Sequence, residues 1–534
     1  MGSKADKTNT DPEKMEKLIA LCRRRGFVYG SSEIYGGLAG AWDYGPLGAE
    51  LKRNVKDHWW RTMTQLRDDI VGLDASILMN RDVWKASGHE ETFTDPVVQD
   101  PLTGKRFRAD QIEPADGTLL TFTGAKLTEP EAAVHDAFSV LADDPGKLEK
   151  ARKSAKAYYA KHCFGGADAK SVELLDEKQE PVTCTTIYSP ETGCRLGEPV
   201  DVNLMFTTTC GLDYKTYLRP ETAQGIFVNF KNVLETSRVK LPFGIAQIGK
   251  AFRNEINPRQ FTFRSREFEQ MEVEFFVRPE DGLAWTDRWL EDRLCWYETI
   301  GLPREQIRVL DVPDTDRAFY SKKTYDLEYA FPFGVSELEG IAYRTDYDLS
   351  QHIQESGKNL EYFDPETNEK LVPHVVEPSA GVDRTVLALL CEAFDEEEIT
   401  NEKGKTETRT VLRFAPCIAP IKAAVLPLLK NKPELVEKAK AVRETLRPYL
   451  NTFYDEAGAI GRRYRRMDEA GTPYCVTIDF ETIEGLKEAT EVTKPDGTKE
   501  TLAAGALDTV TLRHRDSMAQ ERVKIADLLG CLKL

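Results

Sequence analysis

The sequence predicts an α+β fold with an inserted, mostly helical segment and a separate C-terminal α/β domain. Three observations predict it. Strand-like runs alternate with helical stretches from Asn203 to about residue 390. A long, charged helical stretch occupies much of residues 110–200, and the tail alternates strands such as YCVTID with helices such as PELVEKAKAVRETL. Elements of both kinds along one chain are typical of a mixed fold.

The chain is too long for one hydrophobic core, so we expect several domains. Its 534 residues divide into a disordered lead-in at 1–14, a main domain at 15–394 with the insertion at about 110–200, a charged linker at 395–410 and a C-terminal domain at 411–534. No internal repeat is evident.

Composition narrows the class of protein. A net charge of −17 and a pI of about 5.2 argue against indiscriminate nucleic-acid binding but allow one specific RNA partner. No apolar run reaches the roughly 18 to 20 residues that span a bilayer, and the polar N-terminus resembles no secretion signal. We therefore expect a cytoplasmic protein without a membrane partner.

Ten cysteines in such a chain do not predict a disulfide framework. There is no CxxC pair, and Cys184, Cys194 and Cys210 form only a loose cluster without histidine. Structural zinc sites usually have closer pairs, so we expect no zinc.

A helix is predicted from Leu47 to about Leu66, after a glycine-rich segment. Its apolar stripe recurs every four residues at Leu47, Leu51, Val55, Trp59 and Met63. The period predicts one buried face. It does not distinguish packing within a subunit from a dimer contact.

The most informative stretch runs from Phe243 to Val277 as two strands joined by an Arg-rich loop. With a period of two, Met271, Val273 and Phe275 share one face of the second strand, and Phe268, Gln270, Glu272 and Glu274 share the other. On the first strand, Gly249 and Ala251 should leave space beside Arg253, since the three share a face. A permanently charged guanidinium there suits a phosphate, although a solvated face with ion pairs is the alternative.

A second motif, VVEPSAGVDRTVLALL, is predicted to be a strand, a turn and a helix. Arg384 falls in the first turn of that helix, where a cation gains nothing from the helix dipole. An anionic ligand would explain it, and an arginine that simply reaches solvent is the alternative. There is no P-loop and no Rossmann glycine pattern.

These motifs resemble those of class II aminoacyl-tRNA synthetases. FRNE, an Arg-bearing loop and REFEQME resemble motif 2, GVDR resembles motif 3, and the Leu47–Leu66 helix with its following strand falls where motif 1 lies. The strings YLRPETAQGIF, FRNEINPR, REFEQMEVE and EPSAGVDR, with GFVYGSSEIYGG, resemble the homodimeric type of glycyl-tRNA synthetase, subclass IIa-like. The resemblance covers nearly the whole chain and is weakest in the insertion.

The resemblance implies a fold and a reaction. The fold is an antiparallel sheet flanked by helices, with residues 411–534 as an anticodon-binding domain. The reaction is activation of glycine by ATP to glycyl-adenylate, with pyrophosphate released, and transfer to tRNA(Gly). Mg²⁺ is implied as the ion that accompanies ATP. Positioning and cations that stabilise phosphate charge would drive catalysis, without a side-chain nucleophile.

The resemblance also implies site residues. Arg253 would hold the α-phosphate and Arg384 the γ-phosphate as the catalytic pair, Phe268 would stack on adenine and Glu337 would help to place Mg²⁺. The implied ATP-binding residues are Arg253, Asn254, Glu255, Phe263, Arg264, Ser265, Arg266, Glu267, Phe268, Glu337, Leu338, Gly381, Val382, Asp383 and Arg384. The implied glycine-binding residues are Arg108, Glu221, Phe268, Glu269, Gln270, Met271, Glu272, Glu377, Pro378, Ser379, Ala380 and Gly381.

Two further expectations concern metal and RNA. Many members of the family carry paired cysteines before the RAD segment, whereas this chain has QDPLTGKRFRAD. For tRNA, the candidates are Arg462, Arg463, Arg465 and Arg466, for which a solvated helix face is the alternative. Rival interpretations are a non-catalytic accessory subunit, an amino-acid ligase without tRNA, and a class II synthetase for another small amino acid.

Overall fold

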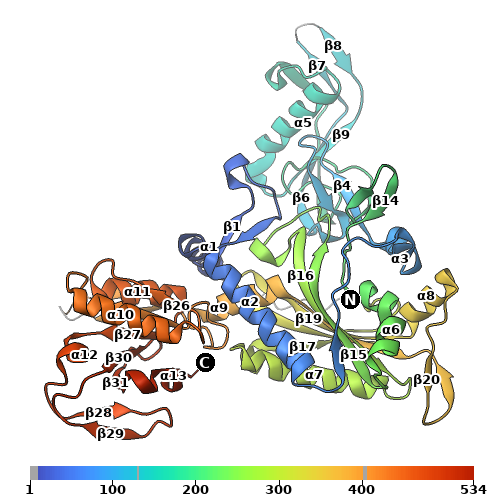
Figure 1. Ribbon diagram of the computed structural model, residues 1–534. Helices are drawn as coiled ribbons and strands as arrows, with labels where there is room; N and C mark the ends of the chain where they lie inside the picture. Colours follow the sequence, from blue (N-terminus) through green and yellow to red (C-terminus); the bar gives the residue numbers. More distant parts are fainter. Residues whose placement is uncertain (1–9, 129–130, 401–403, 405, 534) are drawn as a thin grey trace. The chain divides into compact units, whose positions relative to one another are not determined.

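The computed structural model describes residues 10–128, 131–400, 404 and 406–533, and it forms two compact units (Figure 1). The first unit comprises the chain up to Ser87, Thr208–Phe252 and Arg259–Leu534. The second comprises Gly88–Thr207 and Arg253–Pro258. No helix among the described residues has the length and apolarity to cross a bilayer.

A seven-stranded sheet organises the first unit, in the order β17-β18-β19-β22-β16-β15-β3. All neighbours are antiparallel except β15 and the edge strand β3, which are parallel. The predicted antiparallel sheet is therefore confirmed. The strands are β3 (Ile70–Gly72), β15 (Phe243–Phe252), β16 (Glu267–Val277), β17 (Ile307–Asp311), β18 (Lys323–Phe331), β19 (Gly334–Thr345) and β22 (His374–Gly381).

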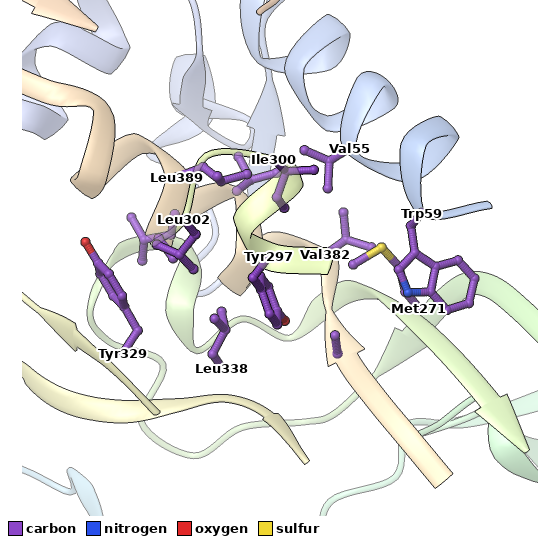
Figure 2. Close-up of a cluster of buried hydrophobic side chains, with 14 of the residues drawn as sticks. Val55, Trp59, Met271, Tyr297, Ile300, Leu302, Tyr329, Leu338, Val382 and Leu389 are labelled. Carbon is purple, nitrogen blue, oxygen red and sulfur yellow. The ribbon is translucent and has the colours of Figure 1, made fainter. Parts of the chain in front are cut away.

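Helices cover both faces of this sheet. One face packs on α1 (Pro12–Arg25), α2 (Pro46–Trp60), α7 (Gly282–Thr299) and α9 (Val382–Ala393) in the largest core cluster. Figure 2 shows part of it, with Trp59 of α2 beside Met271 of β16 and Val382 of α9. The other face packs on α6 (Ala223–Ser237) and α8 (Tyr347–Ser356).

The predicted helix after the glycine-rich segment is α2, which continues as a π-helical turn from Arg61 to Gln65. Pro46 starts it, as the missing N–H of proline favours the first helical position. Leu51 and Val55 are fully buried and Trp59 is 2% exposed. The stripe therefore packs within the subunit, which resolves the alternative that its period left open.

The C-terminal region has a second seven-stranded sheet, in the order β26-β25-β27-β30-β31-β28-β29. Its own core packs against α10 (Pro433–Leu446) and α13 (Leu528–Cys531), and α11 (Ile460–Ala470) covers the other face. Short α12 (Phe480–Glu484) completes this α/β layer. The strands are β25 (Ala423–Pro427), β26 (Thr452–Tyr454), β27 (Tyr474–Ile478), β28 (Thr490–Thr493), β29 (Lys499–Leu502), β30 (Thr509–His514) and β31 (Gln520–Lys524).

Two expected irregular segments are ordered where the structure describes them. The charged segment 395–410 is not a plain linker, because β23 (Phe394–Thr400) pairs with β24 (Thr406–Leu412) along their whole length. At the N-terminus α1 begins at Pro12, with Asp11 accepting from the backbone N–H of Lys14. The helix thus starts inside the expected lead-in, whose residues 1–9 lie outside the described residues.

The second unit contains three three-stranded sheets and one long helix. The expectation that the insertion is mostly helical is wrong. Strands flank α5 (Leu148–His162) on both sides in sequence, and the small residues of α5, such as Ala151 and Ala155, are buried against them. The sheet strands are β4 (Thr94–Gln99), β5 (Arg106–Arg108), β6 (Ala115–Phe122), β7 (Gly124–Leu127), β8 (Ala132–Val134), β9 (Phe138–Ala142), β10 (Val172–Leu175), β11 (Lys178–Thr185) and β12 (Val200–Asn203).

Candidate active site

The β15–β16 pair provides the floor of the candidate site. Register places Gln247 opposite Glu272 and Gly249 opposite Gln270, so these side chains share a face. The predicted division of β16 is confirmed on its apolar side, since Met271, Val273 and Phe275 lie in the largest core cluster.

The space above Gly249 belongs to a residue that the sequence did not single out. A Cβ atom at Gly249 would collide with the guanidinium of Arg219, so the expectation that this glycine makes room for Arg253 is wrong. Arg219 is 2% exposed and donates to the carbonyls of Lys250 at 2.6 Å and Ala75 at 2.8 Å. Burial lowers its pKa.

Three carboxylates and one arginine converge next to α6. The buried Arg344 donates to both oxygens of Glu377, at 2.8 and 3.0 Å, and to both oxygens of Asp348, at 2.8 and 2.9 Å. Glu272, 1% exposed, accepts from the hydroxyls of Thr222 at 2.5 Å and Ser379 at 2.7 Å. Negative groups therefore outnumber the positive one.

Burial and repulsion between neighbouring carboxylates raise the pKa values of Glu272 and Glu377. Burial is the main cause for Glu272, with the Glu221 charge adding to it. Burial also raises the pKa of Glu377 to about 8, against the opposing charge of Arg344. These are the conditions in which a pocket gains from receiving a cation.

Glu274 continues the same face, and it is fully buried. Neither of its oxygens has a hydrogen-bond partner among the described residues. Burial, followed by the Glu377 charge, raises its pKa well above the ordinary range. An ionised carboxylate without a partner is very costly inside a protein, so this burial disfavours the charged form of Glu274.

The side-chain amide of Gln224 positions Glu221, a further acid of the cluster. Gln224 donates to Glu221 and to Asp348, each at 3.0 Å. Its carbonyl oxygen lies 2.8 Å from Nε2 of the buried His352. Since this oxygen only accepts, His352 must hold a proton on Nε2, and the bond fixes which end of the Gln224 amide faces Glu221.

A second charged group lies at the start of α9. Arg384 forms an ion pair with Glu337 at 3.3 Å, and its guanidinium stacks over the Phe263 ring at 4.4 Å. Asp326 is nearby on β18. Burial raises its pKa to about 7, with the charges of Glu337 and Glu328 adding to the effect. The structure thus brings the predicted Arg384, Phe263 and Glu337 together and adds Asp326.

The loop between β15 and β16 is held by local contacts. The backbone N–H and the guanidinium of Arg266 bond to the carbonyls of Gly40 and Ala39 in the glycine-rich segment, at 2.7 and 2.6 Å. The Ser265 hydroxyl donates to the carbonyl of Thr262 at 3.3 Å, and Glu267 pairs with Lys250. Arg264 is half-buried, as is Phe268, whose ring lines a cavity with Ser265 and Glu267.

Several predicted site residues do not direct their side chains to this floor. Glu269 faces α2, where it pairs with Lys52 at 2.7 Å and Lys56 at 2.8 Å. Asp383 accepts from Tyr44 at 2.6 Å and from Lys52 at 2.8 Å. The side chains of four more belong to the hydrophobic core: Met271, Leu338, Ala380 and Val382. The four core residues can contribute only backbone atoms to a ligand, whereas Glu269 and Asp383 line the cavity that Phe268 also lines. Pro378 and Gly381 lie on β22, opposite Ile341 and Gln270.

Four predicted residues belong to the second unit. Arg253 lies over the Phe93 ring, with its guanidinium carbon 5.4 Å from the ring centre. The backbone N–H of Asn254 donates to Leu204 at 2.7 Å, and the N–H of Glu255 to Arg253 at 2.7 Å. Arg108 on β5 pairs with Asp95 at 2.9 Å. Hydrogen bonds to Asp110, then the charges of Asp95, Asp110 and Glu255, raise its pKa.

The arginine cluster of α11 is divided: Arg463 is buried and cannot reach RNA, whereas RNA contact by the other three arginines stays a prediction. Arg463 is 1% exposed and donates to the carbonyls of Asp455 and Leu428, at 3.1 and 3.0 Å. Arg465 and Arg466 pair with Asp468 and Asp455. Of the four, Arg462 alone is exposed.

Sequence reasoning missed Arg219, Arg344 and Asp348. Arg219 lies within YLRPETAQGIF, a string that was noticed, and Arg344 and Asp348 are spaced i, i+4 in the segment YRTDYD. No pattern marks an arginine as buried before its partners are known.

Among the described residues, one acidic group has the closeness of a metal site, namely Glu272, Glu274 and Glu377, whose oxygens lie within 4.8 Å of one another. Its members differ from typical metal ligands, because their oxygens already accept hydrogen bonds. Glu377 accepts from Arg344, and Glu272 accepts from the hydroxyls of Thr222 and Ser379.

Comparison with known families agrees with both sheets. Residues 206–393 match the tRNA synthetase class II core domain (G, H, P, S and T), and residues 422–533 match the anticodon binding domain. The chain is similar in fold to Giardia lamblia prolyl-tRNA synthetase in complex with prolyl-adenylate, with a TM-score of 0.56 at 12% identity, covering 98% of this chain and 77% of that one.

Curated relatives extend over nearly the full length. The glycine–tRNA ligase of Thermobifida fusca is 48% identical over 517 residues, covering 96% of each chain. That of Deinococcus radiodurans is 46% identical, covering 97% of this chain and 98% of its own. That of Thermus thermophilus is 45% identical with the same coverage. With this identity over almost every residue, and with both domains in place, the chain belongs to the glycine–tRNA ligase family of class II aminoacyl-tRNA synthetases.

Proposed function

We propose that this protein activates glycine with ATP to glycyl-adenylate and transfers the glycyl group to tRNA(Gly). The cluster of buried carboxylates on the β15–β16 floor is the observation that carries the proposal. Family membership and the class II core indicate the type of reaction, and the carboxylates indicate where the amino acid would bind.

The pocket fits the ammonium group of an amino acid. A primary ammonium has three donors and no acceptor, and Glu221, Glu272 and Glu377 supply acceptors on one face of the sheet. Ser379 and Gln270 add polar atoms beside Glu272. Arg344 holds Glu377 in position without neutralising the whole cluster.

Glycine is the smallest amino acid, so exclusion suffices for selectivity. The floor beyond Glu272 is filled by Glu274, Phe276 and the helix α6. A larger side chain would overlap with them, and no smaller natural substrate competes, so editing is not required.

Arg253 and Arg384 are proposed to hold the phosphates of ATP, and Phe268 to stack on its adenine. The glycine carboxylate would attack the α-phosphorus in line, and pyrophosphate would leave. Positive charge near the reacting phosphate stabilises charge that develops in the transition state.

Mg²⁺ is proposed to accompany ATP at Glu337 and Asp326. The oxygens of both carboxylates lie close to Gly340, and Mg²⁺ prefers such hard oxygen ligands. When bound, the ion would neutralise phosphate charge. Arg384 would then contact both the phosphates and Glu337, with which it forms an ion pair.

The test is pyrophosphate exchange with each of the twenty amino acids, followed by tRNA charging. Exchange should depend on ATP, Mg²⁺ and glycine, and alanine should give less than about 1% of the glycine rate. Exchange without charging would indicate a ligase that does not use tRNA. Absence of both exchange and charging in a folded preparation would support an accessory role.

The finer features are proposals of the same kind. We expect a cytoplasmic homodimer without stoichiometric zinc. We place the domain boundary near residue 421, because Leu412, Phe414, Ile418 and Ala419 belong to the core of the synthetase sheet. The anticodon-binding domain follows from there, in agreement with the matched residues 422–533.

A further inference from the structure

Two short turns in the second unit share one peptide pattern. The segment DPLTGKR begins at Asp100, and the segment SPETGCR begins at Ser189. Each has proline in its second position, threonine in its fourth, glycine in its fifth and arginine in its seventh. The expectation that the sequence contains no internal repeat is therefore wrong at this short scale.

The first turn is closed by its own side chains. Oδ1 of Asp100 accepts from the backbone N–H groups of Leu102 at 2.8 Å and Thr103 at 3.0 Å. The hydroxyl of Thr103 accepts from the N–H of Lys105 at 3.2 Å. Two backbone bonds, Gly104 N–H to Asp100 C=O and Asp100 N–H to Lys105 C=O, complete it at 2.8 and 2.9 Å.

The second turn repeats every one of these bonds. The Ser189 hydroxyl accepts from the N–H groups of Glu191 at 3.2 Å and Thr192 at 3.3 Å, and the Thr192 hydroxyl accepts from that of Cys194 at 3.2 Å. Gly193 N–H bonds to Ser189 C=O, and Ser189 N–H to Cys194 C=O, at 2.9 and 2.8 Å. Both glycines have a φ of 74°, a value that disfavours other residues.

One strong bond joins the two turns. The Thr192 hydroxyl donates to Oδ2 of Asp100 at 2.6 Å. Asp100 has no exposed surface and Ser189 is 4% exposed. Burial raises the pKa of Asp100, but hydrogen bonds from Ser189, Thr192 and the backbone of Thr103 and Leu102 outweigh it and lower the pKa below its ordinary value.

These positions have the spacing of a zinc site but not its donors. Zinc ribbons bind their metal through two pairs of cysteines, and two residues separate the members of each pair. The same spacing occurs here between Asp100 and Thr103 and between Ser189 and Thr192. Zinc favours thiolate, imidazole and carboxylate ligands. The hydroxyls of Thr103, Ser189 and Thr192 are none of these, so the residues present do not fit the zinc that the paired cysteines of related sequences imply.

We propose that the two turns form a metal-free knuckle, in which the carboxylate of Asp100 serves as the cross-link that a zinc ion provides in a cysteine knuckle. The knuckle closes the β4–β5 pair, since Asp100 follows β4 and Lys105 precedes β5. That pair holds Asp95 against Arg108. The knuckle therefore braces the strands that present Arg108, whatever substrate the enzyme uses.

The experiment introduces four cysteines at these positions and measures whether the protein then binds zinc. The full-length variant D100C/T103C/S189C/T192C and the wild type are purified from the same zinc-supplemented medium and measured by elemental analysis. The variant should hold about one zinc per chain, removable by a chelator with a fall in Tm, and the wild type less than about 0.1. D100C/T103C alone, with half of the ligands, is the matched control and should hold much less than one.

A second measurement covers the case in which the quadruple variant does not fold. In Asp100→Ala, hydrogen exchange of peptides covering residues 100–106 and 189–195 should both speed up at least about tenfold. Thr192→Val should affect both turns as well, and Asp201→Ala, at an exposed position on β12, neither.

Three results would overturn the proposal. The first is a folded quadruple variant without zinc, the second is stoichiometric zinc in the wild type that Asp100→Ala removes, and the third is exchange in Asp100→Ala that matches the Asp201→Ala control.

Discussion

At the scale of single residues, the site is organised by charges that are buried rather than exposed. Arg344 is 3% exposed and binds two acids at once. Removing one partner of such a group leaves the other buried and unpaired, which typically costs more than the contact itself contributes. Substitutions of Arg344 therefore test folding, whereas substitutions of Arg253 test catalysis.

Arg253→Ala should reduce the pyrophosphate exchange rate by at least about a hundredfold while the protein remains folded. A cation next to a reacting phosphate typically contributes several kcal/mol to transition-state stabilisation. Arg106→Ala, at an exposed position on β5, is the control and should exchange normally. Near-normal exchange in a folded Arg253→Ala would show that this residue does not hold the phosphate.

The KM for glycine should fall about tenfold as pH rises from 7 to 9. The ammonium needs ionised partners, and the pKa of Glu377 is raised to about 8 by burial and neighbouring acids. Below that pH the proton competes with the substrate, and each pH unit is worth up to a factor of ten. The KM for ATP, measured in the same exchange assay, serves as the control, and a flat glycine profile would contradict this electrostatic account.

His352→Ala should raise the glycine KM by about three- to tenfold with a smaller change in kcat. The loss of its Nε2–H frees the Gln224 amide to turn, so that an oxygen rather than an N–H faces Glu221. His352→Gln keeps a donor and should recover most of the loss. If Gln restores nothing, the histidine does not act through its donor.

At the scale of elements, periodicity predicted which face of a strand or helix is buried. The alternation of β16 and the apolar stripe that repeats every four residues in α2 both predicted core residues correctly. The spacing of apolar residues identifies the buried face because side chains at that spacing lie on one side of the element. The insertion was misjudged, since one long charged helix outweighed several short strands whose alternation is weak. The side-chain directions of Glu269 and Asp383 were missed because resemblance transfers positions along a chain, not the face of the sheet.

The helix α11 shows the same difficulty for charge. A run of arginines predicted an exposed RNA contact, but the helix geometry turns Arg463 inward. Only packing reveals which arginines have internal acceptors.

Arg463→Ala should therefore lower the free energy of unfolding by roughly 2–4 kcal/mol, since the carbonyls of Asp455 and Leu428 lose their donor. Arg462→Ala, one residue away and exposed, should leave stability within about 0.5 kcal/mol. Urea unfolding of both variants decides this. Equal stabilities would mean that Arg463 is not structural.

At the scale of the whole molecule, the two sheets of the first unit are joined by shared contacts. Arg409 of the β23–β24 hairpin has no exposed surface and pairs with Asp468 of α11 at 2.9 Å. Arg513 on β30 donates to the same carboxylate. The hairpin is a two-stranded sheet of its own that contacts both domains, since Phe394 and Leu412 lie in the core of the synthetase sheet and Arg409 pairs with α11.

Removal of residues 422–534 should leave glycine-dependent exchange largely intact and sharply raise the apparent KM for tRNA. The ligand contacts proposed above all lie before residue 385, and the removed part has its own core. Arg409→Ser in the truncated chain avoids an unpaired buried cation. Size-exclusion chromatography checks that the product is monodisperse, and normal tRNA charging by such a product would refute the assignment of the domain.

A homodimer should appear in light scattering at about twice the chain mass of 60.3 kDa. The α2 stripe cannot form the contact, because it is buried within the subunit. The edge strand β3 and the exposed apolar residues Ile34, Tyr35 and Leu38, which are 88%, 86% and 61% exposed, remain as surfaces. Ile34→Asp/Leu38→Asp should weaken the dimer, and a mass of one chain at micromolar concentration would exclude it.

The unpartnered acid at Glu274 has a consequence for the heat of binding. A pocket that stores a proton among coupled carboxylates exchanges it with solvent when a cation arrives, so glycine should displace protons into the buffer near neutral pH. The apparent enthalpy of binding would then vary with the ionisation enthalpy of the buffer. Glu274→Gln removes one member of the coupled set and should reduce that slope. When glycine binds, its ammonium group would thus replace a proton held by the carboxylates.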